Sequence, residues 1–312
     1  MPAFLRYLCG PRPARTMSSA TQTAETPSPD PAPDESPAQD PWRGGLPALR
    51  AALDRIDDAL HDLLMQRAAV VEQVAKSGKP AAFRPGREAQ IIRRLLARHS
   101  GHLPRVAIFR IWRELLAGTT SMQTQFTLAV CETDAGGAMT QLAREHFGAL
   151  TPLRVHGSPG GALTEVSNQS ASVAILPFPT ETDSWWTTLS KREPRIHVVA
   201  RLPFWTTRPE GAPGTQALVV ATFAPDPSDQ DRSLLALELD ADVSRARLSV
   251  ELTAAGLPAG AMVLWRYPGS AHAQVLVEVE GFVADDDPRL TAVPRRPMVL
   301  GGYAIPTGAN GA

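Results

Sequence analysis

The sequence predicts a multidomain protein in which an all-α three-helix bundle is followed by an α/β domain and then by a smaller α+β domain. Between Leu46 and Val74, apolar residues recur at alternating steps of three and four, which is typical of a helix with one face turned to a core. From Phe126 onward, short apolar runs alternate with helical segments, as in α/β domains. A segment rich in Pro, Asp and Ser, Ala224 to Asp231, then separates the last unit.

The amino-terminal part of the 312-residue chain has a different composition from the rest. Between Ser18 and Asp40 it consists mainly of Pro, Ser, Thr, Ala, Asp and Glu, so we expect it to be disordered. Its first residues contain three arginines, which leaves open a targeting peptide or a true start at Met17. The predicted parts are a disordered arm at 1–43, the helical domain at 44–125, the α/β domain at 126–225, and the α+β domain with a tail at 226–312.

Three amphipathic helices are predicted in the helical domain. The first runs from Pro47 to Ser77, because proline suits the first turn of a helix and Gly78 with Pro80 supplies a stop. The second and third are expected at 87–99 and 104–125. A single long helix cannot cover its own apolar face, so partners from the other helices or from a second chain are required.

The remaining elements follow from apolar runs and turn residues. In the α/β domain we expect a helix at 137–147 and strands at 126–130, 172–176, 197–202 and 216–222. In the last unit we expect a strand at 233–239, a helix at 243–255, strands at 261–267 and 274–281, and then a tail without a predicted element.

The bulk composition excludes several classes of function. A formal net charge of −1 gives no general attraction to nucleic acid or to a membrane surface, and no apolar run approaches the roughly 20 residues of a membrane span. Two cysteines, Cys9 and Cys131, form no disulfide framework, so we expect a cytoplasmic protein. The helical domain shows no metal-ligand spacing and no Gly-rich phosphate loop, so no cofactor is expected.

Polar residues interrupt the apolar stripes of the predicted helices. Arg67 stands in the middle of the first stripe, Glu88 begins the second, and Thr119 and Gln123 continue the third. A buried charge or amide costs free energy unless it is paired. Polar groups directed inward from three helices therefore predict a closed polar cavity for a small charged ligand.

Further cations lie beside these positions, and together they favour a ligand with two carboxylates. The amide of Gln123 can donate a hydrogen bond, and Glu88 can accept one from a hydroxyl group. The set contains no nucleophile–base pair, which favours a reaction that needs only orientation and charge stabilisation. The additional cations are Arg50, Arg87, Lys76 and Lys79.

Three segments at these positions resemble the all-helical class of chorismate mutase. The first helix contributes Leu46-Pro-Ala-Leu-Arg50, Asp54-Arg-Ile-Asp57 and Leu63-Leu-Met-Gln-Arg67. The second and third helices contribute Arg84-Pro-Gly-Arg87-Glu88 and Ile111-Trp-Arg-Glu-Leu-Leu-Ala-Gly-Thr119-Thr-Ser-Met-Gln123. The resemblance implies an intertwined homodimer that rearranges chorismate to prephenate in aromatic amino-acid biosynthesis.

The resemblance also implies roles for individual residues. Arg67 and Arg87 would hold the two carboxylates of chorismate, assisted by Arg50 from the partner subunit. Glu88 would bind the ring hydroxyl, and Thr119 would assist substrate binding. Each residue also has a purely structural alternative: Arg67 and Glu88 could form a buried ion pair, and Thr119 could bond its own helix.

The ether oxygen of chorismate gains negative charge as its C–O bond breaks, so donors placed there stabilise the transition state selectively. By resemblance, Gln123 and a lysine supply these donors. The family's lysine stands four residues after the position of Val74, where this chain has Gly78. We therefore expect Lys79 to take that role, with Lys76 as the alternative; as a purely structural alternative, both lysines would interact with the helix dipole.

The order of the predicted domains resembles that of bifunctional chorismate mutase–prephenate dehydratase, with a periplasmic-binding-like dehydratase domain and an ACT-like regulatory domain. The family's Gly-Pro-x-Gly-Thr-Phe, Pro-x-Glu-Asn-Ser and Thr-Arg-Phe motifs are replaced by Asp134-Ala-Gly-Gly-Ala-Met, Pro177-Phe-Pro-Thr-Glu181 and Thr215-Gln-Ala217. Because Gln216 cannot supply a cation for the carboxylates of prephenate, we expect dehydratase activity to be absent or very weak. The usual ACT signals are also missing, so phenylalanine binding is not expected.

Three hypotheses about function follow from the sequence. The first is an active chorismate mutase with a degenerate dehydratase-like region, which binds chorismate and prephenate and no nucleic acid or membrane. The second is a working bifunctional enzyme that makes phenylpyruvate. The third is a non-catalytic protein that senses a metabolite or binds a partner through its carboxy-terminal region.

Overall fold

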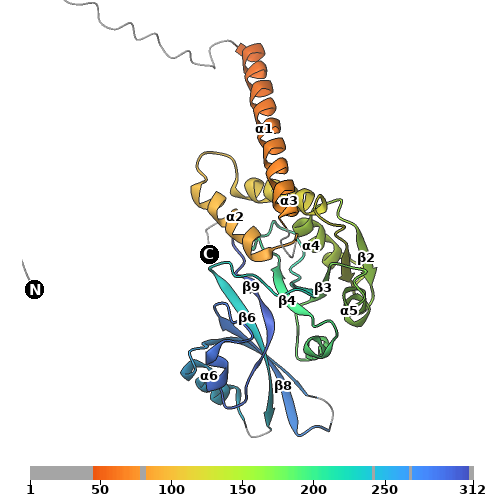
Figure 1. The fold of residues 1–312 in the computed structure, drawn as a ribbon, viewed down its shortest axis with the longest axis vertical. Coiled ribbons are helices and arrows are strands. Elements are labelled where there is room, and N and C mark those ends of the chain that lie inside the picture. The colour runs from red at the N-terminus through yellow and green to blue at the C-terminus, as the bar shows by residue number, and fades with distance from the viewer. Residues whose placement is uncertain (1–44, 78–81, 241–242, 267–268, 309–312) are drawn as a thin grey trace, which may run out of the picture. The chain divides into compact units, whose positions relative to one another are not determined.

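The computed structural model describes residues 45–77, 82–240, 243–266 and 269–308 (Figure 1). The predicted disordered arm at 1–43 lies outside these residues, as do Gly78 and Lys79. The chain forms two compact units, Met1–Asp62 and Leu63–Ala312, and the long helix α1 (Gly45–Lys76) runs through the boundary between them. The predicted first helix, Pro47 to Ser77, agrees with α1 to within two residues at each end.

The apolar stripe of α1 is exposed to solvent. Nine of its large apolar side chains keep between 40% and 62% of their surface accessible, whereas Leu49 and Val71 are half-buried. Isolated apolar residues on a surface are ordinary, but a continuous row along one helix is typical of a surface that another chain covers. The exposed residues are Leu46, Leu53, Ile56 and Leu60 in the first unit, and Leu63, Leu64, Met65, Val70 and Val74 in the second.

Helices α2 (Pro85–Arg98) and α3 (Arg105–Ser121) pack against each other, and α3 also contacts α4 (Ala138–Phe147). Pro85 stands in the first turn of α2, where the missing N–H group of proline carries no penalty. The third helix was predicted to extend to Gln125 but ends at Ser121. The N–H group of Gln123 still donates to the carbonyl of Thr120, 3.0 Å away, so Gln123 lies in a turn that follows the helix.

Nine strands of the described chain form one sheet in the order β2-β1-β3-β5-β4-β9-β6-β8-β7 (Figure 1). Strands β1, β2 and β3 are parallel, whereas β3–β5, β5–β4, β9–β6, β6–β8 and β8–β7 are antiparallel pairs. The strands are β1 (Leu128–Cys131), β2 (Leu153–His156), β3 (Val173–Pro177), β4 (His197–Leu202), β5 (Ala217–Ala221), β6 (Asp231–Asp240), β7 (Ala259–Arg266), β8 (His272–Glu280) and β9 (Met298–Ala304).

Helices cover the sheet and complete three apolar cores. Helix α5 (Pro159–Ser167) and the 3-10 helix η1 (Trp185–Lys191) contribute to one core and α4 to a second. Helix α6 (Arg245–Ala254) and the 3-10 helix η2 (Pro288–Ala292) contribute to the third core, against β6 and β8. The sequence analysis predicted α4, α6 and seven of the strands but missed α5 and β2, whose short segments give little periodicity.

Strand β9 joins the α/β and α+β parts of the chain into one sheet. It pairs with β4 at Val198 and Gly301 and with β6 along most of its length. A Cβ atom at Gly301 would lie 2.1 Å from the carbonyl oxygen of Val198, and the φ of this residue is +127°, so glycine is required at the crossing. No strand was predicted in this segment, because Gly301 and Gly302 weaken the strand pattern.

The substitution Leu235→Ala tests the core of the α+β part. Leu235 lies in β6 and is fully buried, so its loss leaves a cavity that should reduce the free energy of unfolding by about 2–5 kcal/mol. Urea denaturation followed by circular dichroism measures this change. The control Val250→Ala removes a side chain on α6 that is 69% exposed and should change stability by less than about 0.5 kcal/mol. Equal effects of the two substitutions would contradict this description of the core.

Candidate functional site

A cavity of about 340 Å³ lies beside the carboxy-terminal half of α1, the start of α2 and the end of α3. Its floor is apolar, and its polar groups are three arginines, one glutamate, two threonines and one glutamine. The lining residues are Arg67, Val71, Val74, Ala75, Ala82, Arg84, Arg87, Glu88, Ile91, Leu116, Thr119, Thr120 and Gln123.

Five of the seven residues predicted to form the site therefore lie around one cavity. The remaining two are not placed in it: Arg50 belongs to the first compact unit and is exposed, and Lys79 lies outside the described residues. The alternative lysine, Lys76, is exposed and pairs with Glu72 at 3.6 Å. Lys76 is not among the residues that line the cavity. The five residues around the cavity are Arg67, Arg87, Glu88, Thr119 and Gln123.

Arg67, Thr119 and Gln123 form a chain of polar contacts along one wall. A guanidinium nitrogen of Arg67 donates to the hydroxyl of Thr119 at 3.4 Å, and the amide nitrogen of Gln123 donates to the carbonyl of Thr119 at 3.0 Å. The hydroxyl of Thr119 also bonds its own helix, at 2.9 Å from the carbonyl oxygen of Leu115. Partial burial lowers the pKa of Arg67, and the nearby Glu88 opposes this shift. An arginine remains charged despite such a shift, so the wall presents a fixed cation.

Glu88 forms a buried ion pair with Arg113, which the sequence analysis did not single out. Their side chains meet at 2.8 Å between Oε2 and Nη1, and the two residues are 8% and 3% exposed. Glu88 thus forms a buried ion pair, as in the structural alternative, but its partner is Arg113 and not Arg67. Arg113 shares the inward stripe of α3 with Phe109 and Leu116. It could therefore have been identified, like Arg67, as a polar residue that interrupts an apolar stripe.

The same nitrogen of Arg113 lies 3.3 Å from Nε2 of His146 on α4. Arginine has no acceptor, so Nε2 of His146 accepts the bond and the ring proton is on Nδ1. Burial and the charge of Arg113 hold the pKa of His146 well below its ordinary value, which keeps the ring neutral. Burial also raises the pKa of Glu88, against the opposite effect of Arg113.

Two arginines at the start of α2 supply the remaining charge of the cavity. Arg87 is exposed, and its guanidinium contacts Gln90 at 3.3 Å. Arg84 also lines the cavity and pairs with Asp226 at 3.3 Å. With Glu88 compensated by Arg113 and Arg84 by Asp226, the cavity keeps two arginines, Arg67 and Arg87, that favour an anionic ligand.

A separate cavity of about 330 Å³ contains the residues that stand at the dehydratase-like motif, Thr215 and Gln216. Two arginines line it, but carboxylates already compensate both of them. Arg201 donates to Glu278 at 3.2 Å and to Oε1 of Gln216 at 2.9 Å. Arg208 forms a two-pronged pair with Glu145.

Two features are absent from the described residues. No group of three or more His, Cys, Asp or Glu side chains is placed to hold a metal ion. Across the same part of the chain, no helix combines the length and the apolar character that a membrane crossing requires.

The comparisons with known proteins agree with the resemblance of the helical segments. Residues 49–124 match the family model described as chorismate mutase type II. The chain is 27% identical over 139 residues to a bifunctional chorismate mutase/prephenate dehydratase of Pseudomonas aeruginosa, and 26% identical over 135 residues to that of Neisseria gonorrhoeae. These matches cover 42% and 43% of this chain but only 36% and 37% of the relatives. The resemblance to chorismate mutase is confirmed for this segment.

Solved structures give weaker similarities. The prephenate dehydratase of Streptococcus mutans matches 57% of this chain and 97% of its own, with 14% identity and a TM-score of 0.42. GqqA, described as a novel type of quorum quenching acylase, also matches 57% of this chain and 94% of its own, with 14% identity and a TM-score of 0.45. Scores at this level support no conclusion about a shared fold.

The raised pKa of Glu88 makes a prediction about stability. The folded protein binds the Glu88 proton more tightly than the unfolded chain, whose pKa is near 4.5. The contribution of Glu88 to stability is therefore greatest below pH 4.5 and falls as the pH rises through the raised pKa. Urea denaturation of the wild type and of Glu88→Gln between pH 4.5 and 7.5 should show the wild type losing free energy of unfolding relative to the variant. A gain with rising pH would show that Arg113 outweighs burial.

Proposed function

We propose that this protein is a chorismate mutase, an isomerase that rearranges chorismate to prephenate without a cofactor. One observation carries the proposal: Arg67, Arg87, Glu88, Thr119 and Gln123 line a single cavity within the segment that matches the chorismate mutase type II family. The rearrangement is unimolecular and moves no proton to or from the enzyme. A site that offers cations and hydrogen-bond donors without a nucleophile–base pair is sufficient for such a reaction.

The proposed roles divide between binding and transition-state stabilisation. Arg67 and Arg87 bind the two carboxylates and hold the substrate in the folded conformation that brings the reacting carbons together. Glu88, fixed by Arg113, accepts a hydrogen bond from the ring hydroxyl, and Thr119 supports Arg67. These contacts exist in the ground state and in the transition state, so they act mainly on substrate affinity and orientation.

The ether oxygen becomes more negative as its bond to the ring breaks. In our proposal the side-chain amide of Gln123 donates to this oxygen, together with Lys79 or Lys76. A donor that gains strength as charge develops lowers the barrier, because it binds the transition state more tightly than the substrate. The amide of Gln123 already donates one N–H to the carbonyl of Thr119, which orients the other toward a ligand.

We also propose that the active form is a homodimer. The exposed apolar row of α1 supports this, because a second copy of the chain that covered it would remove a large apolar area from water. Arg50, which lies on the same helix, would then reach the cavity of the partner subunit. Each cavity of the dimer would thus be completed by an arginine from the other subunit.

We propose that dehydratase activity is absent or very weak. The support is the compensation of Arg201 and Arg208 by carboxylates and the presence of Gln216 in place of the motif arginine. A bifunctional enzyme is the second candidate. It is favoured by the sequence similarity to the bifunctional chorismate mutase/prephenate dehydratases of Pseudomonas aeruginosa and Neisseria gonorrhoeae.

The test is turnover of chorismate by the purified full chain, with the product identified by mass. Prephenate as the end product supports the proposal. Phenylpyruvate supports the bifunctional candidate. Unchanged chorismate, with a folded protein by circular dichroism, contradicts both; a shift of thermal stability by chorismate would then favour a metabolite-binding protein.

The substitution Arg67→Ala should reduce kcat/KM for chorismate by at least about 10²-fold, because a carboxylate of the substrate loses its charge partner and its position. Circular dichroism should show the helices intact, since Arg67 is only partly buried. Arg98→Ala is the matched control: it removes an exposed arginine at the end of α2, outside the cavity, and should leave turnover unchanged. Full activity of Arg67→Ala would refute the proposed role.

The substitution Leu60→Glu should convert the dimer to a monomer, since it places a charge in the centre of the exposed row of α1. Sedimentation velocity of the wild type and of the variant measures the change. The control Leu150→Glu alters a loop residue that is 90% exposed and should leave the dimer intact. A monomeric wild type at micromolar concentrations would count against the dimer and against the role of Arg50.

A further inference from the structure

We propose that Asp226, in the segment between β5 and β6, is a positioning residue for the cavity at the start of α2. Its carboxylate takes the place of the missing cap of α2 and thereby fixes the backbone that carries Arg87 and Glu88. The inference rests on the proposed function, because it concerns residues that would bind the substrate.

Helix α2 lacks a side-chain cap of its own. Its N-cap residue is Arg84, whose side chain makes no capping hydrogen bond. The first N–H groups of a helix have no partner within the helix and need an outside acceptor, which Asp, Asn, Ser or Thr at the N-cap usually provides. The sequence Arg84-Pro-Gly-Arg87 offers no such acceptor.

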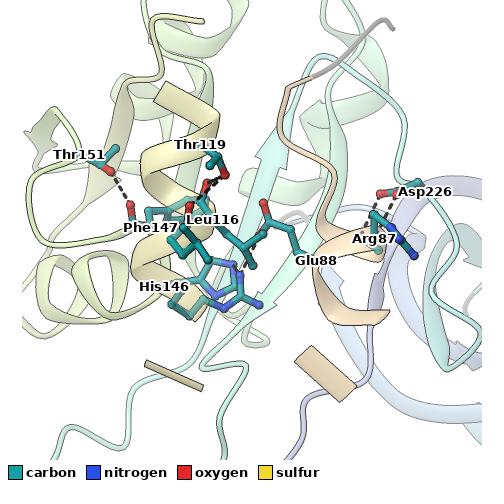
Figure 2. A network of polar contacts seen from close by, with 11 residues as sticks. Arg87, Glu88, Leu116, Thr119, His146, Phe147, Thr151 and Asp226 are labelled. Atoms are coloured by element: carbon teal, nitrogen blue, oxygen red, sulfur yellow. Dashed lines mark hydrogen bonds and ion pairs between the residues drawn. The ribbon is translucent and has the colours of Figure 1, made fainter. Parts of the chain in front are cut away.

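Asp226 supplies the acceptors from 140 residues further along the chain. Its Oδ1 accepts from the N–H of Gly86 at 2.9 Å, and its Oδ2 accepts from the N–H of Arg87 at 3.1 Å (Figure 2). A carboxylate at a helix N-terminus also interacts favourably with the helix dipole. Oδ2 lies 3.3 Å from a guanidinium nitrogen of Arg84 as well, so one carboxylate orients the backbone of two residues and the side chain of a third.

The close approach of two backbones makes this arrangement specific. A Cβ atom at position 86 would lie 2.2 Å from the carbonyl oxygen of Asp226 and 2.8 Å from that of Pro227. Only glycine allows α2 and this segment to come so close. Gly86 is therefore matched to Asp226, and any other residue would push the start of α2 away from the carboxylate.

The segment that carries Asp226 is held against the same face of α2 by further contacts. Arg93 donates to the carbonyl oxygens of Ser228 at 3.1 Å, Gln230 at 3.1 Å and Ile305 at 2.6 Å. Gln90 donates to Asp229 at 2.9 Å. A linker was predicted from Ala224 to Asp231, whereas in the structure this segment supports α2.

These contacts place the region downstream of the helical segment in control of the cavity geometry. Arg84, Arg87 and Glu88 all line the cavity and follow one another within about one helical turn. A shift of this turn would displace two proposed binding residues together. These are Arg87, which would bind a carboxylate of the substrate, and Glu88, which would bind its ring hydroxyl. Both contacts exist before and during the reaction, so the loss of Asp226 should weaken substrate binding more than it slows the bound substrate.

The experiment compares Asp226→Ala, Asp226→Asn and wild type in the full chain by steady-state kinetics with chorismate. Asp226→Ala should raise KM about tenfold, as expected for the loss of a helix cap together with a charge partner, and change kcat less than about twofold. Asp226→Asn retains one acceptor oxygen, so its KM should lie between those of the wild type and of Asp226→Ala. The control Asp285→Ala removes a surface carboxylate that pairs with Arg195 at 2.8 Å and should change neither parameter.

A KM for Asp226→Ala equal to that of the wild type would overturn the proposal. So would a fall in kcat at constant KM, because that pattern indicates only a smaller folded fraction.

Hydrogen exchange of the peptide that covers residues 85–88 is measured on the same variants and requires no turnover. Asp226→Ala should accelerate exchange at Gly86 and Arg87, and Asp285→Ala should not. A wild type that leaves chorismate unchanged refutes the proposed function, whereas unaltered exchange refutes the role of Asp226.

Discussion

The buried ion pair between Glu88 and Arg113 is the interaction on which the arrangement of the site depends. It joins α2 to α3 where both charges are almost completely removed from water. Such a pair gains little net stability, but separating its members would leave an uncompensated charge in the interior at a cost of about 3–5 kcal/mol. The two helices are thereby fixed in one register. His146 accepts a bond from the same arginine nitrogen, so α4 is included in this arrangement.

Charge compensation distinguishes the two cavities that bear on function. Around the first, Arg67 has no carboxylate within ion-pairing distance among the described residues, and Glu88 is already neutralised by Arg113. The cavity is therefore left with an excess of positive charge that an anionic ligand can satisfy. Around Thr215 and Gln216, each arginine has its own carboxylate. An anion entering there would have to compete with partners that are tethered in place.

Much of the fold and part of the site could be predicted from the sequence, because both appear in local periodicity. The polar interruptions of the helix stripes led to Arg67, Glu88, Thr119 and Gln123, and the structure places all four around one cavity. Contacts between distant parts of the chain could not be predicted in this way. The bond from Gly86 to Asp226 spans 140 residues, and no spacing rule connects them. Strand β9 escaped prediction because Gly301, which lies against β4, and Gly302, which lies against β6, lack the side chains that make a strand recognisable.

The position of β9 in the middle of the sheet has a consequence for synthesis of the protein. Strands β4 and β6 lie on either side of β9, yet residues 298–304 leave the ribosome after all the other strands. Until then, an edge of β4 and an edge of β6 carry unpaired backbone groups, and exposed edges of this kind invite pairing with other chains. The two parts of the sheet can therefore be joined only after residues 298–304 have been made.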